Sequence, residues 1–151
     1  MSAPLRLLFD DCLSKHAVNS LREIAQFSRG AVEISHLATL NCEGKLDDEW
    51  VPLLAGGGYL LITTDRAKKK SRGSKLPVLC QRNGMRHVML SAAVHSLSQF
   101  DKLRAIFSVW PKLLNAANAP PGAGFLLKKT SLDVFDLVPV PPRRDADASG
   151  R

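Results

Sequence analysis

The sequence predicts an α/β fold, a three-layer α/β/α sandwich around a mainly parallel central sheet. Short apolar stretches alternate with amphipathic stretches in the order β-α-β-α-β-loop-β-α-β, which is typical of parallel sheets with helices on both faces. Residues 59–65 form the central strand, in which Leu60, Leu61 and Ile62 are consecutive and apolar. Such a run indicates a strand that is covered on both faces.

The N-terminal part of the chain predicts two strands and a helix. Residues 5–9 are an apolar strand, and Ser14 is a suitable N-cap for the helix that follows. Gly30 is expected to close that helix, and the alternating stretch 31–37 predicts a second strand near an edge of the sheet. The helix is indicated by apolar residues at helical spacing: Val18, Leu21, Ile24 and Ala25.

The middle of the chain predicts a short helix from Trp50 to about Ala55, which three glycines terminate before the central strand. Residues 67–75 contain five Lys or Arg in nine positions and are expected to form an exposed, mobile loop. A short helix near residue 77 and a strand at residues 87–90 follow.

The C-terminal part predicts one long helix, a hairpin and a tail. Apolar residues recur at helical spacing from Phe100 to Leu114, which indicates a single helix ending near Asn118. Residues 124–127 and 132–137 are strand-like and are expected to pair. Residues 139–151 are rich in Pro, Arg, Asp and Gly and predict a disordered tail, so residues 1–138 are expected to form a single domain.

Composition narrows the class of protein. The formal net charge of +7 and the pI of about 9.7 favour a polyanionic partner such as nucleic acid. No apolar run approaches the length of a membrane span, and no signal peptide is recognisable, so we expect a cytoplasmic protein without a membrane partner. The three cysteines are widely spaced and are expected to be free thiols rather than zinc ligands.

Acidic residues stand at three points of the predicted sheet. Asp10 follows the first strand, Asp65 follows the central strand, and Asp47 opens the helix before that strand. If the two strands are neighbours, their carboxyl ends lie about 5 Å apart. Carboxylates at such distances repel one another unless a cation lies between them, and Mg²⁺ or Mn²⁺ suits oxygen ligands. Each acid alone also has a structural explanation, since Asp47 and Asp48 are favourable in a first helical turn.

Three segments resemble the PIN-like domains, particularly the bacterial VapC-type toxin ribonucleases: Leu-Leu-Phe-Asp-Asp-Cys-Leu-Ser at residues 7–14, Asp-Asp-Glu-Trp at residues 47–50 and Leu-Leu-Ile-Thr-Thr-Asp-Arg at residues 60–66. The resemblance covers roughly residues 5–114. It implies that metal-binding and catalytic acids stand at Asp10, Asp47 and Asp65, with Asp11 and Glu49 as assistants. The family often has a further acid shortly after the third, but residues 67–86 contain none here, and the next carboxylate is Asp101.

The function implied by this resemblance is that of a metal-dependent endoribonuclease, the toxin of a type II toxin–antitoxin module, which hydrolyses RNA phosphodiester bonds with Mg²⁺ or Mn²⁺. Its expected partners are RNA and a cognate antitoxin. The sequence is compatible with a homodimer but does not fix the oligomeric state. The basic side chains after Asp65 are candidates for contacts with RNA phosphates: Lys68, Lys69, Lys70 and Arg72.

Two other interpretations stay open from the sequence. A phospho-receiver signalling domain also has an acidic pair after its first strand and an Asp after a central strand. It needs a later Ser or Thr and a Lys at the ends of two further strands; Ser91 suits the first position, but Lys75 lies in the basic loop. A PIN-fold protein that binds without catalysing is the second interpretation. A dehalogenase-like phosphatase is disfavoured because Cys12 stands where its second Asp is required.

Overall fold

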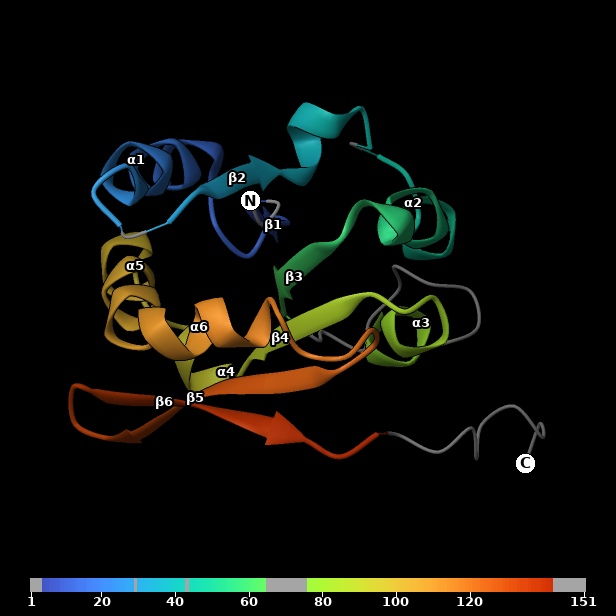
Figure 1. Cartoon of the computed structure of the whole chain (residues 1–151). Coiled ribbons are helices and arrows are strands. Elements are labelled where there is room, and N and C mark those ends of the chain that lie inside the picture. The colour runs from blue at the N-terminus through green and yellow to red at the C-terminus, as the bar shows by residue number, and fades with distance from the viewer. Residues whose placement is uncertain (1–3, 29, 43, 65–75, 143–151) are drawn as a thin grey trace.

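A six-stranded sheet forms the centre of the protein, with the strand order β2-β1-β3-β4-β5-β6 (Figure 1). The computed structural model describes residues 4–28, 30–42, 44–64 and 76–142. All neighbouring strands are parallel except the antiparallel pair β5 and β6. The predicted mainly parallel sheet is therefore confirmed. The strands are β1 (Leu5–Phe9), β2 (Val32–His36), β3 (Tyr59–Thr63), β4 (Arg86–Leu90), β5 (Gly124–Ser131) and β6 (Val134–Val140).

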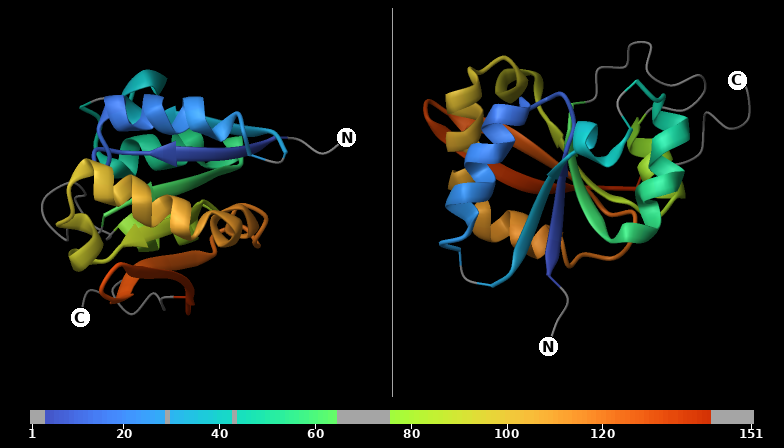
Figure 2. Two further views of the ribbon diagram at one scale, coloured as in Figure 1. Left: turned by 90° about the vertical axis from the view of Figure 1, so that its left-hand side faces the viewer. Right: turned by 90° about the horizontal axis from the view of Figure 1, so that it is seen from above.

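Helices cover both faces of the sheet, as the alternating sequence pattern predicts. On one face lie α1, α5 and α6, with the short α4 beside them, and on the other lie α2 and α3 (Figures 1 and 2). The helices are α1 (Lys15–Ala25), α2 (Asp47–Leu54), α3 (Leu76–Arg82), α4 (Ala92–His95), α5 (Gln99–Ser108) and α6 (Trp110–Ala116), with 3₁₀ turns η1 (Leu37–Leu40) and η2 (Ala55–Gly57). Every helix within the described residues is too short or too polar to cross a bilayer.

Two apolar cores lie on the two faces of the sheet. In β3, Leu60 and Ile62 belong to the core under α1 and α5, whereas Leu61 belongs to the core under α2 and α3. Successive side chains of a strand point to opposite faces, so three consecutive apolar residues serve both cores. Each side chain of this size stabilises the fold by about 1.5–3 kcal/mol when fully buried. The central strand is thus held from both sides.

The register of the sheet brings the ends of two acid-bearing strands together. β1 and β3 are parallel neighbours, and Phe9 pairs with Ile62. The residue after β1 therefore lies beside Thr63, at the carboxyl edge of the sheet. The helix after β1 begins as predicted, because the Ser14 hydroxyl accepts a hydrogen bond from the Ala17 N–H at 3.1 Å.

The prediction of a single helix from Phe100 to about Asn118 is wrong. The chain forms two helices, α5 and α6, which meet at Val109. Pro111 has no N–H and cannot continue the hydrogen-bond ladder of α5, but it fits the first turn of a new helix. The apolar pattern predicts that Phe100 lies on the buried face of this helix, but its side chain is 75% exposed. The buried positions of α5 are Lys102, Ala105 and Ile106.

The predicted hairpin is present and is longer than expected. The Leu132–Asp133 turn joins β5 to β6, and Asp133 has a left-handed backbone with φ 57°. β6 runs to Val140, so Pro139 and Val140 belong to the sheet rather than to the tail. Residues 143–151 and the basic segment 65–75 lie outside the described residues.

Candidate active site

The Asp10 carboxylate stands at the end of β1 and is tied to the neighbouring strand. Its Oδ2 accepts a hydrogen bond from the Thr63 hydroxyl at the end of β3, and its Oδ1 accepts one from the Cys12 N–H at 2.9 Å. Burial raises the pKa of Asp10 above its ordinary value, while the hydrogen bonds from Thr63 and Cys12 oppose this rise. The site therefore holds a desolvated carboxylate that a nearby cation would stabilise in its ionised form.

Asp11 is exposed and lies in the turn between β1 and α1. Its negative charge contributes to the raised pKa of Asp10, so the two carboxylates lie within electrostatic range of each other. The rest of the turn points inward, because Cys12 and Leu13 are 3% and 1% exposed. The turn thus presents its acids at the edge of the sheet and anchors itself in the core.

Asp47 is oriented by a buried tryptophan. It is the first residue of α2, and its Oδ1 accepts a hydrogen bond from the indole N–H of Trp50 at 3.0 Å. Trp50 is 1% exposed, so the indole is fixed by the core between the sheet and α2. Glu49 has a different place: its Oε2 accepts a hydrogen bond from the Leu46 N–H at 2.8 Å and caps α2.

A cavity of about 270 Å³ brings three of the predicted acids together. Asp10, Asp11 and Asp47 all line it, and Glu49 does not. Its remaining lining comes from η1, from the loop before α2 and from Trp50: Leu37, Ala38, Cys42, Gly44, Lys45, Leu46 and Trp50. The Cys80 thiol in α3 lies near two of these charges, since burial raises its pKa and both Asp47 and Asp10 add to the rise. The cavity therefore brings Asp10 and Asp47 to one location, close to the Cys80 thiol.

The other predicted site residues fall outside the described part of the chain. Asp65, which follows Thr64 in the sequence, is among them, as are Lys68, Lys69, Lys70 and Arg72. Within the described ranges, no group of three or more His, Cys, Asp or Glu side chains is arranged to hold a metal ion. Three carboxylates line the acidic cavity, and carboxylate oxygens are the type of ligand that hard divalent cations prefer.

Several side chains that hold the site in place were not identified from the sequence. Thr63 binds Asp10, and the Trp50 indole binds Asp47. Lys102 and Gln99 of α5 contact the turn after Asp10. The partners of Thr63, Lys102 and Gln99 lie more than fifty positions away in the chain. The one usable signal is the spacing of Lys102, Ala105 and Ile106, which places a lysine on a buried helical face.

One comparison with known families identifies the family of this chain. A family model described as a PIN like domain matches residues 5–92, which is more than half of the chain. No curated protein and no solved structure matches the sequence. PIN domains are generally nucleases and generally use divalent metal ions. On this match, together with the fold, the chain belongs to the PIN-like domain family.

Proposed function

We propose that this PIN-like domain is a metal-dependent endoribonuclease that hydrolyses RNA phosphodiester bonds. The observation that carries the proposal is the cavity at the carboxyl edge of the sheet, which is lined by Asp10, Asp11 and Asp47. The cavity adjoins the end of β3, because Asp10 accepts a hydrogen bond from Thr63. Asp65 comes two positions after Thr63 in the sequence and is the fourth acid of the proposed site.

The proposed ligands of a divalent cation are Asp10, Asp47 and Asp65, with Asp11 as an assistant. Mg²⁺ or Mn²⁺ is the proposed ion, since both prefer oxygen ligands. When bound, such an ion lowers the pKa of a coordinated water and offsets the charge of a phosphodiester. Glu49 is assigned to capping α2, because its Oε2 binds the Leu46 N–H and it does not line the cavity.

The chain's own contacts orient these acids before substrate arrives. The Thr63 hydroxyl and the Cys12 N–H bind the two oxygens of Asp10, and the Trp50 indole binds one oxygen of Asp47. Fixed carboxylates need little rearrangement when charge develops in the reaction, and this preorganisation is a large part of catalysis by polar groups. The cavity lining also includes a cation, Lys45, that is suited to an RNA phosphate at its mouth.

RNA as the substrate is supported by the charge of the chain, which is +7 in spite of the acidic cavity. A chain with a net positive charge attracts a polyanion, while the acids of the cavity are left to bind the ion. Lys68, Lys69, Lys70 and Arg72 are proposed to bind RNA phosphates beside the site.

The narrower role of a toxin, neutralised by a cognate antitoxin, rests on the resemblance of the three acidic segments to bacterial toxin ribonucleases. In that role the wild-type chain should arrest growth when expressed in a bacterial host, and Asp65→Asn should not. A neighbouring reading frame that encodes a small protein with a DNA-binding motif would support the pairing.

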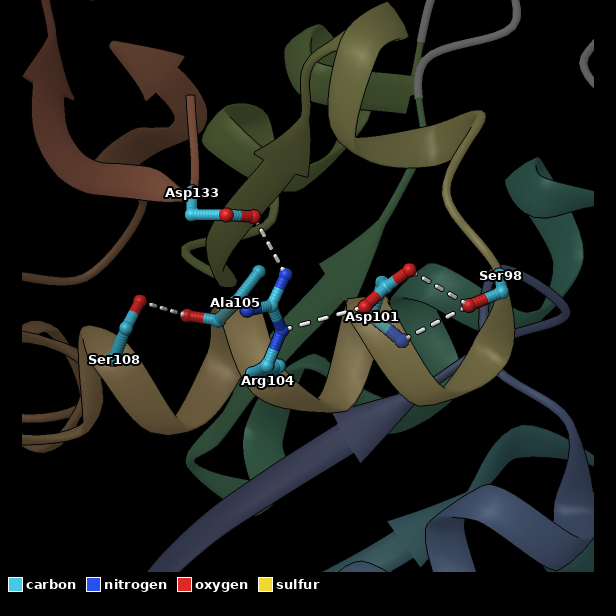
Figure 3. A network of polar contacts seen from close by, with 6 residues as sticks. All are labelled: Ser98, Asp101, Arg104, Ala105, Ser108 and Asp133. Carbon is cyan, nitrogen blue, oxygen red and sulfur yellow. Dashed lines mark hydrogen bonds and ion pairs between the residues drawn. The ribbon is translucent and has the colours of Figure 1, made fainter. Parts of the chain in front are cut away.

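The test of the ribonuclease proposal is RNA cleavage with Mn²⁺ or Mg²⁺ and with EDTA, over a broad set of RNAs. Asp65→Asn keeps the size of the side chain and removes its charge, so it should abolish metal-dependent cleavage without unfolding the protein. Asp101→Asn is the matched control. Asp101 lies in the first turn of α5, where it interacts with Ser98 and Arg104, and Arg104 in turn pairs with Asp133 (Figure 3). It does not line the acidic cavity, and its substitution should leave cleavage intact.

Equal cleavage in EDTA, or full activity of Asp65→Asn, would refute the metal nuclease proposal. Mn²⁺ titration separates it from a PIN-fold protein that only binds RNA. A catalytic site should bind Mn²⁺ and lose that binding in Asp65→Asn. A binding protein should take up RNA equally well with and without the ion.

A further inference from the structure

We propose that Lys102 and Gln99 of α5 are positioning residues, which hold the turn that carries Asp10 and Asp11 in the arrangement needed for divalent-ion binding. The inference rests on the proposed function for its metal readout. It extends the site to a helix that lies outside the segment matched by the family model, which ends at residue 92.

Lys102 is a buried cation directed at the main chain of the acidic turn. Its side chain reaches from α5 to the turn after β1, and its Nζ donates a hydrogen bond to the Cys12 carbonyl at 3.0 Å. Lys102 is 5% exposed and is the one buried Lys or Arg within the described part of the chain. Burying an ammonium group is unfavourable unless it is compensated, so a lysine at this position needs a structural reason.

The same residue, Cys12, links Lys102 to the acid. The Cys12 N–H binds Asp10 Oδ1 at 2.9 Å, while the Cys12 carbonyl accepts a hydrogen bond from the Lys102 ammonium. A shift of the Cys12 main chain would therefore move the hydrogen-bond donor of Asp10. This is the path by which Lys102, which does not line the acidic cavity, acts on a proposed metal ligand.

Two further side chains hold the following residues of the turn. The Gln99 Oε1 accepts a hydrogen bond from the Ser14 N–H at 2.9 Å. His36 of β2 binds the Leu13 carbonyl through Nε2 at 3.0 Å, and its Nδ1 accepts the Ala38 N–H. The main chain of three successive residues after Asp11 is thus fixed by side chains from α5 and β2.

Lys102 also has an electrostatic effect that opposes its positioning effect. The Lys102 ammonium binds the carbonyl of Cys12, and the N–H of the same residue binds Asp10, so the positive charge of Lys102 lies near the acids. A positive charge near the acids disfavours a second cation. Removing the charge of Lys102 should therefore tighten Mn²⁺ binding if charge dominates, and weaken it if positioning dominates.

The experiment compares Lys102→Met with Lys112→Met. Methionine keeps much of the lysine stem and removes the ammonium group. Lys112 lies on α6, is 58% exposed and pairs with Asp136, so it is a lysine-to-methionine control away from the site. Mn²⁺ affinity is measured by calorimetry on each folded protein. We expect binding to Lys102→Met to be about 10-fold weaker or more, the range seen when groups that support metal ligands are removed, and binding to Lys112→Met to be unchanged.

A metal-free readout separates the two proposals. Hydrogen exchange of the Cys12 and Leu13 amides should be faster in Lys102→Met than in wild type, and unaltered in Lys112→Met. If wild type binds no Mn²⁺ but this exchange responds, the proposed function fails, and what stands is that Lys102 holds the turn after Asp10. Unchanged exchange, or Mn²⁺ binding by Lys102→Met that equals or exceeds that of wild type, would overturn the positioning role.

Gln99→Leu provides a second test should Lys102→Met fail to fold. Gln99 is exposed, so its substitution removes the acceptor of the Ser14 N–H without disturbing the core. Several-fold weaker Mn²⁺ binding by folded Gln99→Leu supports the role of α5. Wild-type affinity and wild-type amide exchange in this variant contradict it.

Discussion

Trp50→Phe tests whether the indole N–H orients Asp47 for ion binding. Trp50 is 1% exposed, and its Nε1 donates to Asp47 Oδ1 at 3.0 Å. Phenylalanine keeps an aromatic ring in the core under α2 but removes the donor and part of the ring. A hydrogen bond to a charged group contributes about 1.5–3 kcal/mol, and the smaller ring volume adds to the cost. We expect a destabilisation of about 3 kcal/mol, which lowers the Tm by roughly 6–12 °C for a chain of this size.

The second tryptophan of the chain supplies the matched control. The Trp110 Nε1 donates to the Ser28 hydroxyl, also at 3.0 Å, and neither residue lines the acidic cavity. Trp110→Phe thus removes an indole hydrogen bond of the same distance, but one with a neutral acceptor. This hydrogen bond lies on the opposite face of the sheet. It should cost some stability and leave Mn²⁺ affinity unchanged, whereas Trp50→Phe should weaken Mn²⁺ binding by about 10–100-fold.

Fluorescence makes the assay specific. The chain contains two tryptophans, so Trp110→Phe leaves Trp50 as the sole indole emitter. Mn²⁺ bound beside Asp47 should alter that emission in a saturable way, and calorimetry on Trp50→Phe should show weaker binding. The assigned role of the indole would be refuted if a folded Trp50→Phe protein bound Mn²⁺ with undiminished affinity. It would also be refuted if Trp50 fluorescence in Trp110→Phe did not change on addition of Mn²⁺.

Two further predictions concern charge. Burial raises the pKa of Asp10 above its ordinary value, so the folded protein binds more protons at this site than the unfolded chain, and stability falls as pH rises through the folded pKa. Asp10→Asn should accordingly raise the urea midpoint of the metal-free protein at pH 7, with a smaller gain near pH 4; a lower midpoint at pH 7 would contradict the sign. Substituting Lys68, Lys69 and Lys70 with Ala should reduce the salt slope of single-stranded RNA binding by about 0.7 for each phosphate that is no longer neutralised, and an unchanged slope would exclude these residues from the interface.

The fold was predictable where the signal is local. The apolar run of β3 and the alternation of strands and helices depend on neighbouring residues, and both appear as expected. The break between α5 and α6 was missed because apolar residues continue at helical spacing on both sides of Pro111. The buried face of α5 consists of Lys102, Ala105 and Ile106. It was missed because a lysine stands at a buried position where an apolar residue is expected.

The position of Asp10 was predictable for a related reason: parallel strands end at one edge of a sheet, so Asp10 could be placed at that edge from the end of a strand alone. Its supports were not predictable. The Thr63 and Lys102 hydrogen bonds join residues separated by 53 and 90 positions, and no sequence pattern specifies such a pair. Glu49, an acid close to Asp47 in sequence, binds the main chain of Leu46 through Oε2 and does not line the cavity, and its assisting role stays a prediction.

The acidic site depends on more of the chain than the segment that the family model matches. That segment ends two residues after β4, and β4 is completed by β5: Leu90 pairs with Leu127, and the Ser91 N–H donates to the Leu127 carbonyl at 2.9 Å. The core against which Phe9 packs includes Ala105 and Ile106 of α5. Without β5 and α5, residues 5–92 would expose this face of the sheet to water, and the turn after Asp10 would no longer be bound by Lys102 and Gln99. The positions of the Asp10 and Asp11 carboxylates therefore depend on α5 as well as on the matched segment, and substitutions at Lys102 and Gln99 are expected to alter the proposed ion binding.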